Sequence, residues 1–386
     1  MREVAIVGVG LSRWGEMWNA SLRTLWAEAA LAALADAGID HVDAVTVGCM
    51  SPGLFIGQEH LGALLVDELG IAGVPATRVE SACASGGLSL KTGFAEIAAG
   101  LADVVLATGV EKMTDVSGDD CTAALATAAD AEREVFDGAS FPALYAMMAR
   151  AHMERYGTTR EQLAMVAVKN HKHGALNPNA QYRQEITVAD VLASPKVASP
   201  LNVLDCSPIT DGAAAVVLAE LSVAKRLAKG RPLVRITGIG QATDRIALHD
   251  RRDLTALPAT TKAAQRAFAM ADKQPRDIQL AEVHDCFTIA EIMVLESLGL
   301  CEPGHGGCQA SSGRTALGGE QPVNASGGLK SKGHPVGATG VAQAVELTTQ
   351  LRGDAGKRQV PGARVGLAQN MGGTGASTLV HILEVR

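Results

Sequence analysis

Two thiols and two imidazoles stand out in this sequence, because each lies where a strand-like run ends or a glycine-rich turn begins. Cys83 stands just before "ASGG", His284 and Cys286 end the run "LAEVHDC", and His334 lies within "KGHPVGATG". In α/β proteins the loops at strand ends gather into one site. A cysteine held near an imidazole is a typical pairing of nucleophile and base. The pattern therefore indicates covalent catalysis by a cysteine.

Each of these residues also has a purely structural explanation. A cysteine is often a small buried hydrophobic residue, and His284 or Cys286 alone is equally explained as a satisfied core histidine or a packing thiol. After Cys83, however, Gly86 and Gly87 allow close backbone approach at the start of a helical pattern. Unpaired N–H groups and the positive dipole end of that helix favour the thiolate, the nucleophilic form. We therefore expect an activated nucleophile at Cys83, with packing as the alternative.

The elements that must position these residues repeat along the chain. Its 386 residues are enough for about two domains of roughly 150 residues each. The apolar runs "EVAIVGVG" at 3–10 and "LVRITGIG" at 233–240 are each followed by a helical pattern, and "ASGGL" occurs at 84–88 and 325–329. Such alternation, occurring twice, predicts two similar α/β halves. The GxG elements are only a weak nucleotide-binding signal.

A segment from about 116 to 200 interrupts this rhythm. It combines helical periodicity with His, Lys and Arg, and it ends in a loop-like stretch. We interpret it as an insertion that caps a site, whereas a solvated helical hairpin with a charged face is the alternative. The apolar run after "DCSPITDG" predicts a buried strand that rejoins the first half. The predicted division is an N-terminal half at 1–115, the insertion at 116–200, a return to the N-terminal half at 201–225, and a C-terminal half at 226–386.

Composition narrows the possible functions. Hydrophobic residues make up 47% of the chain but aromatic residues only 3%, so small aliphatic residues and 42 glycines must form close helix-on-sheet layers. The net charge of −7, with acids and bases interspersed, argues against a nucleic-acid or membrane-surface role. Seven cysteines without paired CxxC spacing argue against disulfides and structural zinc. These features predict a cytoplasmic protein.

The sequence contains no recognisable targeting signal, as expected for a cytoplasmic protein. The start, "MREVAIVGVG", enters a strand-like run without a charged-then-apolar leader, and no apolar run reaches membrane-spanning length. The end, "HILEVR", is not a peroxisomal SKL address. Because it follows soon after the last strand-like run, we expect no fused sterol-carrier domain.

Four motifs in order, "ESACASGG", "EVHDCF", "NASGGLKSKGHPVGATG" and a terminal glycine-rich turn, resemble the thiolase family. The similarity covers essentially the whole chain. It is closest to the acetoacetyl-CoA branch with an HDCF motif, found in archaeal-type and sterol-carrier-protein-type thiolases. The resemblance implies an α/β protein with a thiolase-like five-layered αβαβα fold of two pseudo-repeated halves, and an inserted loop domain over coenzyme A.

The resemblance also implies a chemistry, the reversible Claisen condensation of two acetyl-CoA to acetoacetyl-CoA and coenzyme A. Cys83 would carry the acyl group and His334 would accept its proton. One oxyanion hole would combine His334 with a water held by His284, and the other the backbone N–H groups of Cys83 and Gly372. Ser207 matches a serine that contacts the pantetheine arm. No metal or separate cofactor is implied, because the coenzyme A thioester is the substrate.

At one position the chain departs from the commoner thiolase pattern. Most family members place a second cysteine in a C-x-G at the final turn, where this chain has "NMG" with Asn370. That cysteine is the acid/base that removes the α-proton of the second acetyl-CoA. In the HDCF branch, Cys286 is the thiol able to replace it.

Other functions remain open at this level. A decarboxylating ketoacyl synthase would share the fold and the nucleophile, but the HDCF cysteine argues against it. A degradative 3-ketoacyl-CoA thiolase of broader chain length uses the same residues in reverse. A non-catalytic lipid carrier or scaffold predicts erosion of the site, yet all four site residues are present. The resemblance also suggests a homodimer or homotetramer, and a complex with HMG-CoA synthase and a small zinc-ribbon/OB-fold protein.

Overall fold

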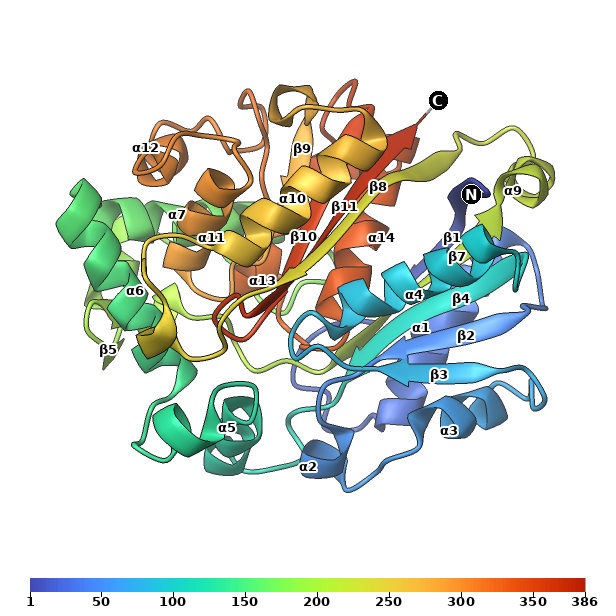
Figure 1. The fold of residues 1–386 in the computed structure, drawn as a ribbon, viewed down its shortest axis with the longest axis horizontal. Coiled ribbons are helices and arrows are strands. Elements are labelled where there is room, and N and C mark those ends of the chain that lie inside the picture. Colours follow the sequence, from blue (N-terminus) through green and yellow to red (C-terminus); the bar gives the residue numbers. More distant parts are fainter. Residues whose placement is uncertain (386) are drawn as a thin grey trace.

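Nine strands run through the centre of the protein in the order β3–β2–β4–β7–β1–β8–β11–β10–β9 (Figure 1). The computed structural model describes residues 1–385. The first half contributes β1 (Val4–Leu11), β2 (Ala44–Gly48), β3 (Ala76–Val79), β4 (Val104–Glu111) and β7 (Gly212–Glu220). The second half contributes β8 (Val234–Thr243), β9 (Leu280–Glu282), β10 (Val365–Gly372) and β11 (Ser377–Val385).

The two halves repeat the same pairing. In each half a parallel pair, β2 with β4 or β9 with β10, is followed by two antiparallel pairs, β4–β7–β1 or β10–β11–β8. In the first half β3 adds a further parallel pair with β2. Val323 forms an isolated parallel bridge with Ala281 of β9, at the place that β3 occupies beside β2. The halves meet at a short antiparallel contact between β1 and β8. The duplication predicted from the sequence is therefore present.

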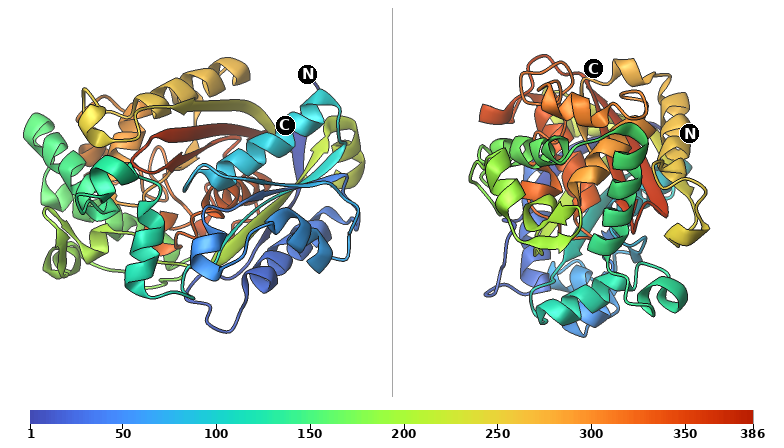
Figure 2. Two further views of the ribbon diagram at one scale, coloured as in Figure 1. Left: turned by 60° about the horizontal axis from the view of Figure 1, so that its bottom comes forward. Right: turned by 90° about the vertical axis from the view of Figure 1, so that its left-hand side faces the viewer.

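The helices form three layers around the two half-sheets (Figures 1 and 2). The first half holds α1 (Leu22–Ala37), α2 (Pro52–Ile56), α3 (Leu61–Glu68), α4 (Ser85–Ala99) and α9 (Leu221–Ala228). The second holds α10 (Pro258–Ala271), α11 (Thr288–Ser297), α12 (Gly306–Ser311), α13 (Gly328–Ser331) and α14 (Thr339–Arg352). Helix α1 packs on β1 and β7, α10 packs on β8 and β11, and α4 and α14 pack on each other between the half-sheets. This arrangement is the predicted αβαβα layering.

The repeated GxG elements serve this layering. A Cβ atom at Gly10 of β1 would lie 2.1 Å from the carbonyl oxygen of Ala29 in α1, and one at Gly240 of β8 would lie 1.8 Å from that of Ala263 in α10. Neither distance is possible for a side chain, so glycine lets each outer helix approach its strand. The GxG elements therefore have a packing role, since they let an outer helix lie directly against its strand.

The "ASGGL" repeat corresponds only in part. In the first half it opens α4, whereas in the second it leads into the short helix α13, and the buried helix α14 begins only after "GHPVGA". Gly340 of α14 is the residue that packs on Gly87, since a Cβ at Gly340 would lie 2.2 Å from the Gly87 nitrogen. The close approach of the two central helices therefore joins the "ASGG" and "GATG" motifs.

The insertion lies between β4 and β7, at the left of Figure 1. It contains α5 (Gly118–Ala126), a short π-helix (Ala131–Val135), α6 (Phe141–Tyr156), α7 (Arg160–Gly174), α8 (Val188–Ala193), and the strands β5 (Lys196–Ala198) and β6 (Leu201–Asn202). Helix α7 buries polar as well as apolar residues against α11, α12 and α13. It is therefore a packed layer and not a solvated hairpin. The two-stranded β5–β6 sheet of the insertion ends at Asn202, just past the predicted boundary of 200.

Membrane insertion of a helix finds no support in this fold. Within residues 1–385, none of the helices has both the length and the apolar character that crossing a bilayer requires.

Candidate active site

A cavity of about 370 Å³ opens where the start of α4 faces the end of β10 and the insertion. Four of the residues predicted from the sequence line it, namely Cys83, Ser207, Cys286 and His334. The insertion contributes Thr122, Leu125, Ser140, Phe141, Pro142, Tyr145 and Val197 to its wall. Side chains from both halves and from the insertion thus meet in one mostly apolar pocket.

Cys83 is presented to this cavity by a strained turn. The preceding Ala82 has a positive φ of 49°, which is costly for a residue with a side chain and is common at functional sites. Ser85 holds the turn, because its Oγ accepts from the Ser81 N–H at 2.9 Å and donates to the Ala82 carbonyl at 2.6 Å. The short side chains of "ESACAS" therefore build the turn that positions the thiol.

The protonation of Cys83 differs from the expectation. Burial raises the pKa of Cys83 to about 12, although the backbone N–H groups of Gly373 and of Cys83 itself act in the opposite direction. The helix start therefore does not offset the loss of solvation, and the resting thiol is protonated at neutral pH. A base must take its proton during attack.

His334 is placed to be that base. One potential ligand atom each from Cys83, His284 and His334 lie within 4.8 Å of one another, and the two rings meet edge to face with centroids 4.9 Å apart. His334 Nδ1 lies 2.7 Å from Thr339 Oγ1, which leaves Nε2 for the thiol. Burial lowers the pKa of His334 to about 3, so the ring is neutral and able to accept a proton.

His284 lies beside His334 and Cys83, in contact with β10. Its backbone N–H donates to Gln369 Oε1 at 3.0 Å, and its Nδ1 lies 3.2 Å from Asn370 Nδ2. Burial also lowers the pKa of His284 well below its usual value, and Nε2 has no hydrogen-bond partner among residues 1–385. The imidazole is therefore neutral, with one nitrogen left for a ligand.

Cys286 and Ser207 both line the cavity. The Ser207 N–H donates to the Cys286 carbonyl at 2.8 Å, so the two segments are tied together. Burial raises the pKa of the Cys286 thiol well above its usual value, whereas a hydrogen bond from Tyr145 lowers it. The structure thus brings both thiols to one cavity, as an acyl carrier and a separate acid/base require.

The glycine turn after β10 brings a second glycine, Gly373, to the Cys83 thiol. Gly372 directs its carbonyl to the N–H groups of Gly375 and Ala376, and a Cβ there would lie 2.4 Å from the Ser81 oxygen. The N–H group that reaches the Cys83 thiol belongs to Gly373, which also lines the cavity. Gly373 is therefore a further candidate donor for the second oxyanion hole, beside the predicted Gly372.

Tyr145 of α6 was missed by sequence reasoning. Its hydroxyl donates to the Gly373 carbonyl at 2.9 Å, and its ring stacks on Phe287 with centroids 4.4 Å apart. Because it also reaches Cys286, this phenol joins both thiol-bearing segments. The available signal was a tyrosine on the apolar face of "FPALYAMM" in a chain with only three tyrosines.

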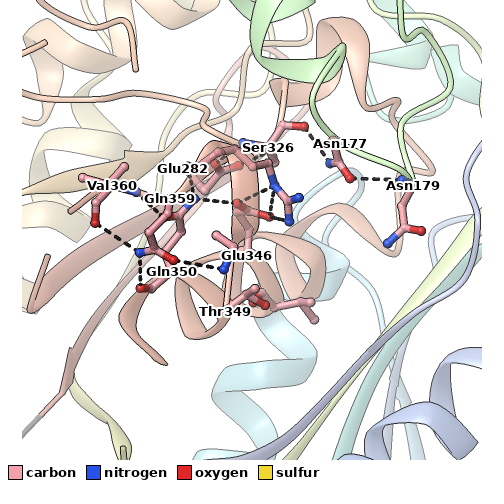
Figure 3. A network of polar contacts seen from close by, with 12 residues as sticks. Asn177, Asn179, Glu282, Ser326, Glu346, Thr349, Gln350, Gln359 and Val360 are labelled. Carbon is pink, nitrogen blue, oxygen red and sulfur yellow. Dashed lines mark hydrogen bonds and ion pairs between the residues drawn. The ribbon is translucent and has the colours of Figure 1, made fainter. Parts of the chain in front are cut away.

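A buried polar network braces the loop that carries His334 (Figure 3). Glu282 of β9 accepts from both the N–H and the hydroxyl of Ser326, and Asn177, which follows α7, donates to the Ser326 carbonyl at 2.8 Å. On the far side, Glu346 accepts from Gln350 of the same helix and from Arg358. The insertion and the second half therefore hold this loop between them.

Family models and sequence relatives match almost the whole chain. The family model described as "Thiolase, N-terminal domain" matches residues 4–222, and "Thiolase C-terminal domain-like" matches 240–385. The chain is 53% identical to "Acetyl-CoA acetyltransferase" of Methanothermobacter thermautotrophicus over all of both chains. It is 37% identical to "Sterol carrier protein 2" of Bos taurus over 97% of this chain and 70% of that one.

Solved structures show the same architecture. An "Ltp2-ChsH2(DUF35) aldolase" chain is 27% identical, with a TM-score of 0.86 over 99% of this chain and 98% of that one. Human mitochondrial 3-ketoacyl-CoA thiolase in complex with CoA has a TM-score of 0.75 over 100% of this chain and 98% of that one. At 19% identity, this second likeness concerns the fold alone.

Proposed function

Because this chain belongs to the thiolase family, we propose that it is an acetyl-CoA C-acetyltransferase, which joins two acetyl-CoA into acetoacetyl-CoA and coenzyme A. The observation that carries the proposal is the meeting of Cys83, Cys286 and His334 in one cavity. Two thiols with one neutral imidazole supply an acyl carrier, an acid/base and a proton acceptor. The names of full-length relatives at 53% and 44% identity support the choice of acetyl-CoA.

In the first half-reaction, the Cys83 proton passes to His334 as the sulfur attacks the thioester carbon. The negative charge that develops on the carbonyl oxygen is stabilised by the N–H groups of Gly373 and Cys83, or by those of the histidine pair. Collapse of this intermediate forms the Cys83 thioester and expels the coenzyme A thiolate. That thiolate takes the proton back from His334 and leaves as coenzyme A.

In the second half-reaction, Cys286 removes a proton from the α-carbon of another acetyl-CoA. The resulting carbanion attacks the acyl group on Cys83 and releases the Cys83 thiolate. This thiolate takes the α-proton from Cys286, which restores both thiol groups to their starting forms. Because the pKa of Cys286 is raised, the resting thiol is ready to donate this proton in the thiolysis direction. Condensation requires its deprotonated form and should therefore become faster as pH rises.

The test of this function begins with the purified protein. Acetyl-CoA should give acetoacetyl-CoA and coenzyme A, and acetoacetyl-CoA with coenzyme A should give acetyl-CoA. Peptide mass spectrometry should locate an acetyl group on Cys83, and Cys83→Ala should lose several orders of magnitude in rate. A stable acetyl group on another residue would contradict the assignment.

A degradative thiolase of broader chain length uses the same residues, so acyl length must be measured. Thiolysis of a series of 3-ketoacyl-CoA substrates decides between the two: a maximum at acetoacetyl-CoA supports the proposal, and a maximum at longer chains supports the alternative. A non-catalytic lipid carrier is not favoured, because the cavity retains both thiols and the imidazole.

We further propose a cytoplasmic homodimer or homotetramer that needs no metal or cofactor besides its thioester substrate. The aldolase relative is named as an assembly with ChsH2(DUF35), which supports a small zinc-ribbon/OB-fold partner, and HMG-CoA synthase would complete the complex. Light scattering of the purified protein tests the oligomer. Co-purification with the two tagged candidate partners tests the complex.

A further inference from the structure

His284 and His334 are two neutral imidazoles beside the Cys83 thiol, and their function depends on which ring nitrogen of each carries the proton. A neutral histidine has one N–H donor and one bare acceptor nitrogen, and its neighbours decide which nitrogen is which. His284 and His334 meet edge to face at an angle of 85° beside Cys83. Identical tautomers would give two bases or two donors, whereas opposite tautomers would give one of each.

The side-chain amide of Asn370 settles the tautomer of His284. Its Oδ1 accepts from the Gly87 N–H at 3.1 Å, and its Nδ2 donates to the Cys83 carbonyl at 2.9 Å. A backbone N–H only donates and a carbonyl only accepts, so the amide has a single possible orientation. The remaining amide hydrogen then faces His284 Nδ1 at 3.2 Å. Nδ1 must therefore be bare, and Nε2 carries the proton.

His334 has the reverse arrangement. Thr339 Oγ1 donates to the Pro335 carbonyl at 3.0 Å, so its lone pair faces His334 Nδ1 at 2.7 Å. Nδ1 then carries the proton, and Nε2 is the bare acceptor. The backbone N–H of His334 is held separately by Thr210 Oγ1 at 2.9 Å, which fixes the segment without involving the ring.

We propose that Asn370 and Thr339 are positioning residues that hold the two histidines in opposite tautomers. His334 then presents a proton acceptor to Cys83, and His284 presents an N–H directly to the carbonyl oxygen of the acyl group. The buried Nε2 of His284, without a protein partner among residues 1–385, is the donor that such an oxygen would satisfy. The role in acyl transfer rests on the proposed function, whereas the tautomers do not.

This arrangement also bears on metal binding. Cys83, His284 and His334 offer atoms of the types that zinc binds, and these atoms lie within 4.8 Å of one another. Zinc needs a bare nitrogen from each histidine, and His284 offers an N–H because of Asn370. The Asn370 side chain therefore favours binding of an oxyanion at His284 and disfavours binding of zinc.

The first experiment reads the tautomers in the wild-type protein. Ring-labelled ¹⁵N-histidine NMR distinguishes protonated from bare ring nitrogens, and His284→Asn and His334→Asn variants assign the two signals. We expect protonated Nε2 in His284 and protonated Nδ1 in His334 at neutral pH. The same tautomer in both rings overturns the proposal, whether or not the protein condenses acetyl-CoA.

The second experiment exchanges the amide for a carboxylate. Asn370→Asp keeps an acceptor for the Gly87 N–H but places an acceptor opposite His284 Nδ1, so the His284 proton should move to Nδ1. Acetylation of Cys83 should then fall by about 10²–10³-fold, as for the loss of one oxyanion donor. The variant should also become sensitive to zinc, which a merely structural loss would not produce.

Thr339 provides the matched pair of controls. Thr339→Ser keeps the hydroxyl and should keep the His334 tautomer, whereas Thr339→Val removes it at nearly equal size and should slow Cys83 acetylation. An Asn370→Asp protein that retains both the His284 tautomer and the wild-type acetylation rate overturns the role of Asn370. If that variant does not fold, the wild-type spectrum decides.

Discussion

Cys286 is the residue whose role depends most on the missing cysteine at Asn370. If it is the acid/base for the α-carbon, Cys286→Ala should still accept an acetyl group on Cys83, because that step uses His334 and the oxyanion donors. Condensation should fall by about 10²–10⁴-fold, and deuterium should no longer enter the methyl group of acetyl-CoA. Equal slowing of both half-reactions would instead indicate a packing thiol.

The pH dependence follows from the raised pKa of the same thiol. Its deprotonated fraction grows as pH rises toward that pKa, so wild-type condensation should accelerate through the alkaline range, while thiolysis, which uses the protonated thiol, should not. Initial rates in both directions across pH check this. A condensation rate that falls with rising pH, in protein that stays folded, would assign the step to another group.

Tyr145 should act through Cys286. Tyr145→Phe keeps the ring that stacks on Phe287 but removes the hydroxyl. Its single hydrogen is donated to the Gly373 carbonyl at rest and can turn to the Cys286 thiolate, where it lowers the pKa of Cys286. The condensation profile should therefore shift to higher pH, by about one unit for one lost hydrogen bond to a charged group. Acetylation of Cys83 should change much less. An unshifted profile would limit Tyr145 to a packing role.

At the scale of elements, the contact between α4 and α14 sets the distance between nucleophile and base. Gly340→Ala would place a methyl 2.2 Å from the Gly87 nitrogen and 2.3 Å from Asn370 Oδ1. Because both neighbours are fixed, the central helices must separate, and the free energy of unfolding should fall by about 1–3 kcal/mol. The condensation rate of the folded variant should also fall, because Cys83 precedes α4 and His334 precedes α14, and separating the two helices moves the thiol away from the imidazole.

A control distinguishes this effect from a general response to glycine replacement. Gly118, in the first turn of α5, has open space where a Cβ atom would lie, with no neighbour within 4 Å, and its φ is not positive. Gly118→Ala should leave the denaturation midpoint unchanged or slightly raised, because alanine is the better helix former. A similar loss in both variants, measured by urea denaturation, would reject the close-contact explanation.

At the scale of the whole molecule, the insertion should be stabilised by ligand. It supplies much of the cavity wall, including Phe141 and Tyr145, so bound coenzyme A should slow amide exchange in α5, α6 and the β5–β6 sheet. Hydrogen exchange with saturating coenzyme A tests this. Helix α9, remote from the cavity residues, is the internal control, and unchanged exchange throughout 116–202 would count against a role in coenzyme binding.

Much of this protein could be predicted from its sequence because the signals are local. Apolar periodicity and the repeated GxG runs indicate two α/β halves, and glycine occurs where a helix must lie against a strand. The order of the Cys, HDCF and GHP motifs indicates the thiolase family, its nucleophile and its base. These features depend on residue type and spacing, which a linear sequence contains.

Only the tertiary structure decided the protonation and the detailed partners at the site. Burial keeps the Cys83 thiol protonated despite its helix start, because loss of solvation depends on atoms that are far away in the chain. The backbone N–H group that reaches the Cys83 thiol belongs to Gly373, the first residue after strand β10. Asn370 contacts Gly87, Cys83 and His284 across 283, 287 and 86 residues, and no local pattern predicts such contacts.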